Sequence, residues 1–396
     1  MTTAHGQKIG VITATIIGMN AMIGSGIFTA PAAMATYVGP AGILAYIFVV
    51  FAVWCMALSF SRLAQLFPAE GSFYTYTKQW AGKLGGVISA GSYLIGLIIA
   101  MGLLAQVAGM YLNALLPQFS ITTLGAATLV ILVVLNMYGV IVSQTGQHIL
   151  IATTVFPLIA ITAICLWHGK ISNLTPFAPY GFSHVFKATR IVIFGFFGFE
   201  CAASLFSIVE NPAKNVPRAL AYSILGVGIL YILFVASIIL ATPSSYFSDP
   251  RIPLSQVLME VIPHHAWMVN LIHIAILSAI IGTIHSMIWS ASAFLTTLVA
   301  QVSKNSFLER SPATAVTIIG AAIATTFLTF SNLNLFFSLT AIFIITAFIL
   351  SMITLLGIKS EWQSGRNSIT LCGILTASII LYFAGEGLIF EIAKIT

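Results

Sequence analysis

Eleven long apolar stretches occupy most of the chain and limit its possible folds more than any other feature. They lie at about residues 9–36, 41–66, 84–114, 121–139, 148–168, 187–209, 218–241, 266–300, 313–331, 334–357 and 368–388. A helix needs about 20 apolar residues to cross a hydrocarbon core about 30 Å thick. Backbone groups in lipid must bond within their own segment, so each stretch is expected to be helical. The pattern predicts an all-α integral membrane protein with about 11 transmembrane helices.

The composition excludes most other classes of protein. Of 396 residues, fifteen are Lys or Arg and nine are Asp or Glu, which is 6% against about 25% in an average soluble domain. Basic residues stand singly despite the net charge of +6, so we expect a lipid bilayer and no nucleic acid as partner. We also expect no enzyme, metal site or cofactor, because no CxxC pair, HExxH motif or paired acids within a span occur. A channel is a weaker alternative, since no repeated filter motif is present.

The basic residues predict the orientation of the chain in the membrane. Cytoplasmic loops carry an excess of Lys and Arg. With the N-terminus inside, ten of these residues fall in inner segments and five in outer segments, of which the loop at 169–190 and the link at 242–265 are the longest. We therefore expect residues 1–8 to be cytoplasmic, in the cytoplasmic (inner) membrane of a bacterial-type cell.

The first apolar stretch is a poor continuous helix. It contains Gly24, Ser25 and Gly26 near its middle, with Pro31 close behind. In a helix interior a glycine costs about 1 kcal/mol and a proline about 3 kcal/mol. Unwound backbone at membrane depth is tolerated only where it lines a cavity or is buried in protein. The cluster therefore predicts a helix that is interrupted at a binding cavity.

A second interruption is predicted in the sixth stretch, where Gly195 and Gly198 are followed by Glu200. Five spans separate the two glycine clusters, so the first and sixth helices run in opposite directions. Such paired breaks are typical of inverted-repeat secondary transporters, although glycines also serve helix packing in membranes. We expect a first repeat at 9–168 (helices 1–5), a second at 187–357 (helices 6–10), and an additional eleventh helix with the C-terminus at 368–396.

The two breaks suggest the chemistry of the ligand. The N-terminus of a half-helix offers free N–H groups and a positive dipole end to an anion. Unwound carbonyl groups accept hydrogen bonds from an ammonium group. A zwitterion that carries a carboxylate and an amine fits both, which predicts an amino acid as the small-molecule substrate.

Four motifs together carry a family resemblance. Residues 24–28 (GSGIF) resemble a first-helix signature, and residues 197–200 (FGFE) resemble a broken sixth helix. Residues 210–220 (ENPAKNVPRAL) are similar to an E-x-NP-x-(K/R)-N-x-PRA link, and residues 68–76 (PAEGSFYTY) to a P-x-x-G-x-x-Y-x-Y loop. These motifs resemble those of the amino acid–polyamine–organocation (APC) superfamily of amino acid permeases and antiporters. The resemblance implies a 5+5 inverted-repeat (LeuT-like) fold with helices 1 and 6 discontinuous, working by alternating access, with a homodimer among the forms it allows.

The resemblance also implies a set of substrate-binding residues. The amides of Ser25, Gly26 and Ile27, in the break that begins at Gly24, would hold the substrate carboxylate. The carbonyl groups of Met22, Phe194 and Phe197 would accept from the amine, with the Phe194 ring as a gate. The remaining contacts would come from the break at Gly195 and Gly198, from Leu97 and Met101 in the third helix, and from Met287 in the eighth.

The predicted pocket is more apolar than in arginine/agmatine antiporters. Met101 stands where those relatives often carry a polar side chain, and Met287 stands where they carry tryptophan. This favours a neutral amino acid as substrate. A cationic amino acid or polyamine antiporter of the arginine/agmatine type is the alternative.

Two titratable residues lie in the middle of predicted spans, Glu200 and His285. Ionisable residues inside a membrane are costly to bury and usually functional, and histidine titrates near neutral pH. We expect them to sense or couple protons, with a structural hydrogen-bonding role as the alternative for each. A sodium site also stays open, because it needs only carbonyl and hydroxyl groups such as those of Ser290 and Ser292.

Overall fold

The structure, a computed structural model, describes residues 8–24, 26–67, 72–139, 144–200, 209–247, 254–265, 267–303, 307–330 and 332–394, and helices dominate these ranges. The first part of the chain forms α1 (Val11–Met22), α2 (Gly26–Tyr37), α3 (Gly42–Leu66), α4 (Ser72–Leu115), α5 (Ile121–Met137) and α6 (Gln144–Trp167). The second part forms α7 (Ser183–Val192), α9 (Pro212–Ala241), α10 (Leu254–Val261), α11 (Trp267–Ser303), α12 (Phe307–Arg310), α13 (Pro312–Thr329), α14 (Leu333–Leu356), α15 (Lys359–Gln363) and α16 (Asn367–Ala393). Each of the eleven predicted stretches contains at least part of a helix, which confirms the all-α fold.

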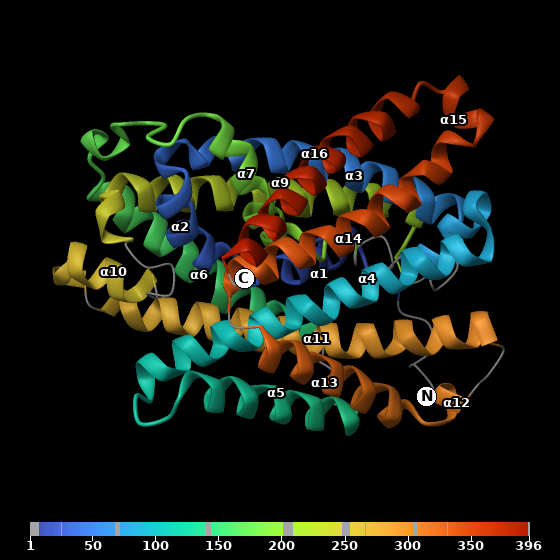
Figure 1. Ribbon diagram of the computed structural model, residues 1–396, viewed down its shortest axis with the longest axis horizontal. Coiled ribbons are helices and arrows are strands. Elements are labelled where there is room, and N and C mark those ends of the chain that lie inside the picture. Colours follow the sequence, from blue (N-terminus) through green and yellow to red (C-terminus); the bar gives the residue numbers. More distant parts are fainter. Residues whose placement is uncertain are drawn as a thin grey trace.

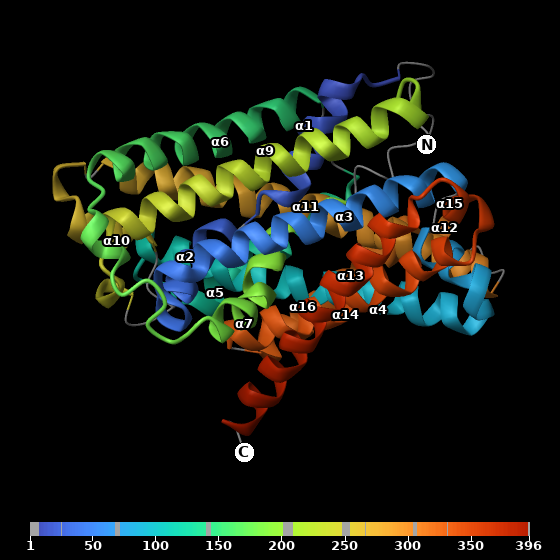
Figure 2. The same ribbon diagram turned by 90° about the horizontal axis from the view of Figure 1, so that it is seen from above.

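Most of the long helices run roughly along one axis of the molecule (Figure 1). In the described ranges, eight helices are long and apolar enough to cross a membrane, and α1 and α5 are shorter apolar helices. Toward one end of the axis lie α2, α7 and α10, while α12 and α15 lie at the other end (Figures 1 and 2). The chain is thus a multi-pass membrane protein.

Two helices are interrupted at the glycine clusters. Between α1 and α2, Ile23 leaves the helical conformation (φ −78°, ψ 90°). After α7 the chain forms a short 3-10 helix, η3 (Ile193–Phe196), and then extends at Phe197 (φ −60°, ψ 139°). Gly198 follows with φ 108°, which residues with a Cβ rarely adopt. The predicted discontinuities of the first and sixth helices are confirmed.

The packing of the helices repeats between the two parts of the chain. The contact of α4 with α5 has a counterpart in that of α11 with α13, and α1 packs on α9 as α7 packs on α3. Likewise, α6 contacts α9 and α11, as α14 contacts α3 and α4. Each pair turns into its counterpart when the two parts are exchanged. Such an exchange is the packing expected of the two repeats that the sequence predicts, and their bounds stay a prediction.

Backbone hydrogen bonds tie the two broken helices together at both ends of the molecule. Glu210, which lies beyond the sixth span, donates its N–H to the carbonyl of Ile9 at the start of the first (3.0 Å). Ala41, beyond the end of α2, donates to the carbonyl of Phe177, which precedes α7 (2.8 Å). In each tie, a residue that follows one broken helix bonds to a residue that precedes the other. The ties therefore join the same two spans at opposite ends.

Local differences from the sequence expectations lie in the links. The sixth span begins earlier than residue 187, at Ser183, because Phe186 is already packed between Phe48 and Phe383. The link at 242–265 contains the helix α10, which buries Leu254 and Leu258 on one face. A short amphipathic helix of this kind has no long apolar stretch, so hydropathy does not reveal it.

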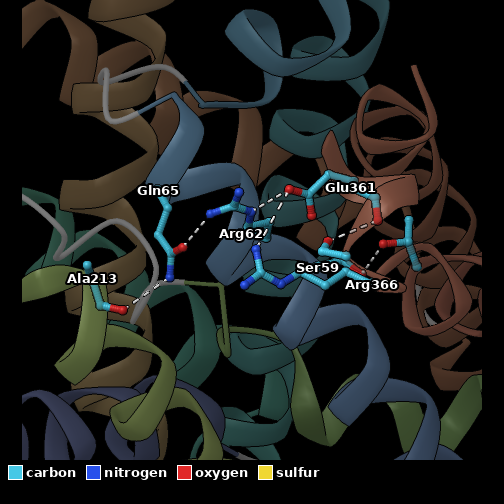
Figure 3. Close-up of polar contacts among 8 residues, drawn as sticks. Ser59, Arg62, Gln65, Ala213, Glu361 and Arg366 are labelled. Carbon is cyan, nitrogen blue, oxygen red and sulfur yellow. Dashed lines mark hydrogen bonds and ion pairs between the residues drawn. The ribbon is translucent and has the colours of Figure 1, made fainter. Parts of the chain in front are cut away.

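The last helix, α16, lies outside the two predicted repeats and packs against α3, α7 and α14. Near its beginning it is fastened by Glu361, a buried carboxylate of α15. Arg62 of α3 donates Nε–H to Glu361 Oε1 at 2.7 Å, and Arg366 Nη1 lies 3.9 Å from the same oxygen (Figure 3). A direct, partly buried ion pair thus joins α3 to the segment that leads into α16.

Candidate functional site

The two helix breaks touch each other through their backbones. A Cβ on Gly26 would lie 2.8 Å from the Cα of Gly195 and 3.1 Å from its nitrogen, closer than side-chain carbons are found in proteins. At Gly198, a Cβ would collide with the carbonyl group of Ala21, near the end of α1. Glycine is therefore required at these positions by the close approach of the two chains, and the breaks form one junction.

The first break is supported by side chains of its neighbours. The carbonyl of Met22 accepts from the N–H of Gly24 (2.9 Å) and from the hydroxyl of Tyr231 in α9 (3.2 Å). A Cβ on Gly24 would lie 3.6 Å from Oγ1 of Thr283 and 3.8 Å from Cδ2 of Leu104. These contacts place α4, α9 and α11 around the first break. The predicted residue Ser25 lies outside the described residues.

The sixth break carries its own carboxylate. Glu200 is 6% exposed, and its Oε2 accepts from the backbone N–H of Gly198 at 3.0 Å. Its Oε1 accepts from the hydroxyl of Tyr93 in α4 at 2.8 Å. The side chain that the sequence marks as the mid-span acid is thus folded back onto the break and held by two donors.

Aromatic rings cover the sixth break. Phe194 is buried, and its ring makes edge-on contacts with Phe337 of α14 (centroids 5.2 Å apart) and with Phe197 (6.4 Å). Phe197 in turn contacts Phe348 of α14 (6.2 Å). The ring of Phe194, for which a gating role is predicted, is therefore covered by apolar side chains.

The third and eighth spans contribute mainly apolar side chains. Leu97 and Met101 are fully buried in α4, and helical spacing puts them on the same face as Leu104, which lies against the first break. In α11, Met287 is partly buried and one turn from Thr283. Sequence reasoning missed Leu104 and Thr283, although the same spacing, one turn from Met101 and from Met287, identifies both.

His285 and Ser292 of α11 have other partners. Nδ1 of His285 lies 2.9 Å from Nδ2 of Asn136 in α5. The hydroxyl of Ser292 donates to the carbonyl of Ile288 within its own helix (2.7 Å). In the described residues, no group of three or more His, Cys, Asp and Glu side chains is arranged to hold a metal ion. Of the polar side chains of α11, Thr283 approaches the break.

Comparison with known proteins agrees with this architecture. The model of the amino acid permease family matches residues 9–390, nearly the whole chain. The chain belongs to the amino acid permease family. This confirms the predicted APC membership, and the family is one of permeases rather than enzymes.

The family includes characterised relatives of moderate similarity. The branched-chain amino acid permease BcaP of Bacillus subtilis (strain 168) is 28% identical over 276 residues, which are 64% of this chain and 59% of BcaP. The putrescine transporter PotE of Escherichia coli (strain K12) is 26% identical over 261 residues, 64% of this chain and 59% of PotE. The matches therefore span about three fifths of these relatives.

A solved structure shares the fold. The crystal structure of MhsT in complex with L-phenylalanine matches with a TM-score of 0.67 over 97% of this permease and 100% of that chain. The two sequences are 14% identical, so the likeness concerns the fold alone. It confirms the predicted LeuT-like transporter fold.

Proposed function

We propose that this permease is a secondary active transporter that moves amino acids across the cytoplasmic membrane by alternating access. The observation that carries the proposal is the junction of the two helix breaks, where Gly26 and Gly195 meet backbone to backbone. Two interrupted helices that run in opposite directions bring non-helical backbone to one place in the membrane. Such a place is where secondary transporters hold their substrates.

The first break is suited to the substrate carboxylate. α2 begins at Gly26, so the amides of Gly26 and Ile27 belong to its first turn. The helix dipole makes this end of α2 positive, which attracts a carboxylate. The carbonyl of Met22 contributes less to binding of the substrate amine than its sequence position suggests. It already accepts hydrogen bonds from Gly24 and Tyr231.

The sixth break is suited to the substrate amine. Its carbonyl groups at Phe194 and Phe197 come from non-helical or 3-10 backbone, and Glu200 adds a negative charge beside Gly198. An ammonium group is attracted to both kinds of acceptor. A zwitterion placed across the junction then has each of its charges next to backbone of the opposite polarity.

The surroundings favour a neutral amino acid with an apolar side chain. Leu97, Met101, Leu104, Phe194 and Met287 offer no hydrogen bond to a polar side chain. The names of similar proteins agree with this, since BcaP is a branched-chain amino acid permease and MhsT was crystallised with L-phenylalanine.

A cationic amino acid or polyamine is the second candidate. Glu200 is the observation that favours it, because a buried carboxylate beside the break can attract a second ammonium group. The relative PotE is a putrescine transporter. Against this candidate, both oxygens of Glu200 already accept hydrogen bonds, from Tyr93 and Gly198.

The wider mechanism follows from the two ties between the broken helices. We propose that 9–168 and 187–357 are inverted repeats that rock around the junction, with residues 1–8 on the cytoplasmic side. Opening to the inside then breaks the tie of Glu210 to Ile9, and opening to the outside breaks the tie of Ala41 to Phe177. A proton at Glu200 or His285 is the proposed coupling ion, and sodium near Thr283 is the alternative.

Counterflow in proteoliposomes tests the proposal. Vesicles preloaded with an unlabelled amino acid should accelerate uptake of the labelled one through a carrier, whereas a channel shows no such acceleration. Branched-chain and aromatic amino acids should be the best counter-substrates, and arginine and putrescine the poorest. A matching thermal-shift screen reports binding alone, because a ligand stabilises the state that it binds. If no amino acid or polyamine stabilised or exchanged, the proposal would be wrong.

A further inference from the structure

A buried cation lies outside the site described so far. Arg190, in the last turn of α7, is 8% exposed, and its Nε is buried without a hydrogen-bond partner among the described residues. The ion pairs of nearby charges run elsewhere: Lys187 pairs with Glu386 (2.6 Å) and Lys394 with Glu391 (3.3 Å). Burying a charge without direct pairing is costly, so such a residue calls for a functional explanation.

The guanidinium of Arg190 is seated against α16 at a glycine. A Cβ on Gly387 would collide with the guanidinium, so this position is a notch that only glycine leaves open. Two turns of α16 carry carboxylates within electrostatic reach of Arg190, at Glu386 and Glu391, and the hydroxyl of Tyr37 is also within reach. Among the described residues, the cation therefore lies near acidic groups without a direct ion pair to any of them.

Both broken helices are linked to the same two helices, α14 and α16. Tyr37 ends α2, and its hydroxyl accepts from Nδ2 of Asn334 at the start of α14 (2.7 Å). Asn332, the residue before α14, donates to Glu391 of α16 (2.8 Å). α2 and α7, which lie at the same end of the molecule, thus both reach the pair α14 and α16 through one polar network.

We propose that Arg190 is a positioning residue for the substrate site. It docks α7 on α16 in the Gly387 notch and exchanges this position for a direct pair with Glu391 when α7 moves in the transport cycle. Because Phe194 follows Arg190 by one helical turn, the docking sets where the sixth break and its aromatic cover lie. The inference rests on the proposed function. It adds the contact between α7 and α16 to the contacts that change in the transport cycle.

The ion pair near the beginning of α16 differs from the contact of Arg190 with this helix. There, Glu361 is paired directly with Arg62 of α3 at 2.7 Å, and both partners are satisfied (Figure 3). Within the part of the chain that the structure describes, Arg190 has no such direct pair. A charge without a direct partner can shift toward a nearby carboxylate at little cost, whereas a direct ion pair resists separation.

Two glycines of α16 provide a matched test. Gly387→Ala should eject the guanidinium, whereas Gly385→Ala adds a methyl group where no atom lies within 4 Å. In a background without native cysteines, Leu104→Cys reports access to the first break through its reaction with an impermeant thiol reagent added from each side of the membrane. We expect Gly387→Ala to change the ratio of the two rates by at least about fivefold, the scale of a coupled conformational equilibrium. Gly385→Ala should leave it within about twofold.

Charge variants test the exchange of partners. Arg190→Gln and Glu391→Gln should each shift the labelling ratio in the same way, and the double variant should add nothing further. Lys187→Gln, on the same helix but in a half-exposed ion pair, should change the ratio by less than about twofold. If Arg190→Gln fails to fold, Arg190→Lys keeps the charge without the planar guanidinium and takes its place.

The outcomes separate this proposal from the transport function. Equal labelling ratios for Gly387→Ala and Gly385→Ala, or a loss of melting temperature in Arg190→Gln with an unchanged ratio, would reduce Arg190 to a structural role. Labelling needs no substrate, so the result stands even if counterflow fails to detect amino acid transport.

Discussion

The first and sixth breaks lie back to back, yet their backbone groups are satisfied in different ways. At the first break, support comes from other helices: Tyr231 donates to Met22, and Thr283 lies near Gly24. At the sixth break, support comes from the chain itself, because Glu200 folds back onto Gly198. One break is positive at the start of a half-helix, and the other carries a carboxylate.

On the proposed function, this difference between the two breaks explains how a chain with few charges recognises a zwitterion. An inverted repeat supplies two similar backbone interruptions, and a single acidic side chain then distinguishes them. We infer that the first break, which lacks an acidic residue of its own, binds the substrate carboxylate, while the sixth break binds the amine. Changes that remove the contact between the breaks should therefore do the most damage, and changes to the neighbours of one break should do less.

The largest effect is expected for Gly26→Ala. The new methyl group would lie 2.8 Å from Gly195 Cα, so the two breaks must separate. A displacement of about 1 Å at a reacting or binding centre costs on the order of 100-fold, and we expect counterflow to fall by at least that factor. Gly91→Ala in α4, where a Cβ meets nothing within 4 Å, is the matched control. Near-normal counterflow in Gly26→Ala would mean that the breaks are not in contact in the states that transport.

A smaller, more selective effect is expected for Glu200→Gln. The amide keeps the size of the side chain but loses the charge, and one of its two acceptors becomes a donor facing Gly198 or Tyr93. A charge-assisted hydrogen bond contributes about 1.5–3 kcal/mol, so the KM for a zwitterion should rise roughly 10- to 100-fold. The pH dependence of uptake should flatten.

Two comparisons sharpen the Glu200 prediction. Tyr93→Phe removes one donor to the carboxylate and leaves the charge, so its KM should change less than that of Glu200→Gln. For substrate analogues without the amine, the KM values of wild type and Glu200→Gln should be similar. If both variants raised the KM of an analogue without an amine as much as that of the amino acid, Glu200 would act on the fold of the break rather than on the amine.

A moderate effect is expected for Tyr231→Phe. The variant removes the hydroxyl that donates to the carbonyl of Met22 and leaves the buried ring in place. A neutral hydrogen bond contributes about 0.5–1.5 kcal/mol, so melting temperature should fall by a few degrees and KM should rise about two- to tenfold. Tyr222→Phe, on the exposed side of α9, is the control. An unchanged KM would show that the first break keeps its shape without this support.

The two breaks also differ in how far their sequence predicted them. Glycines at 24, 26, 195 and 198 cannot be accommodated in regular helices without cost, so both interruptions follow from composition and spacing. The partners of each break do not follow, because they come from distant helices. Tyr231 and Thr283 are two of several polar residues in their spans, and only the packing of α9 and α11 on α1 brings them to the break. The position of Arg190 against Gly387 depends in the same way on how α16 crosses α7.

The smallest effect is expected for Thr283→Val, and it concerns the direction of change more than its size. The hydroxyl of Thr283 is buried without a hydrogen-bond partner among the described residues, 3.6 Å from a Cβ placed on Gly24. Valine has nearly the same shape, so removing an unsatisfied polar atom should leave the melting temperature of the free protein unchanged or higher. If the hydroxyl instead serves a substrate or a cation at the first break, KM should rise by roughly two- to tenfold in the same variant. A gain in stability combined with a loss of affinity marks a polar atom that is kept for its ligand.

Thr297→Val, on the exposed side of α11, is the control, since its hydroxyl bonds within the helix to Ala293. Unchanged KM in Thr283→Val would assign the support of the first break to Tyr231 and to backbone contacts alone.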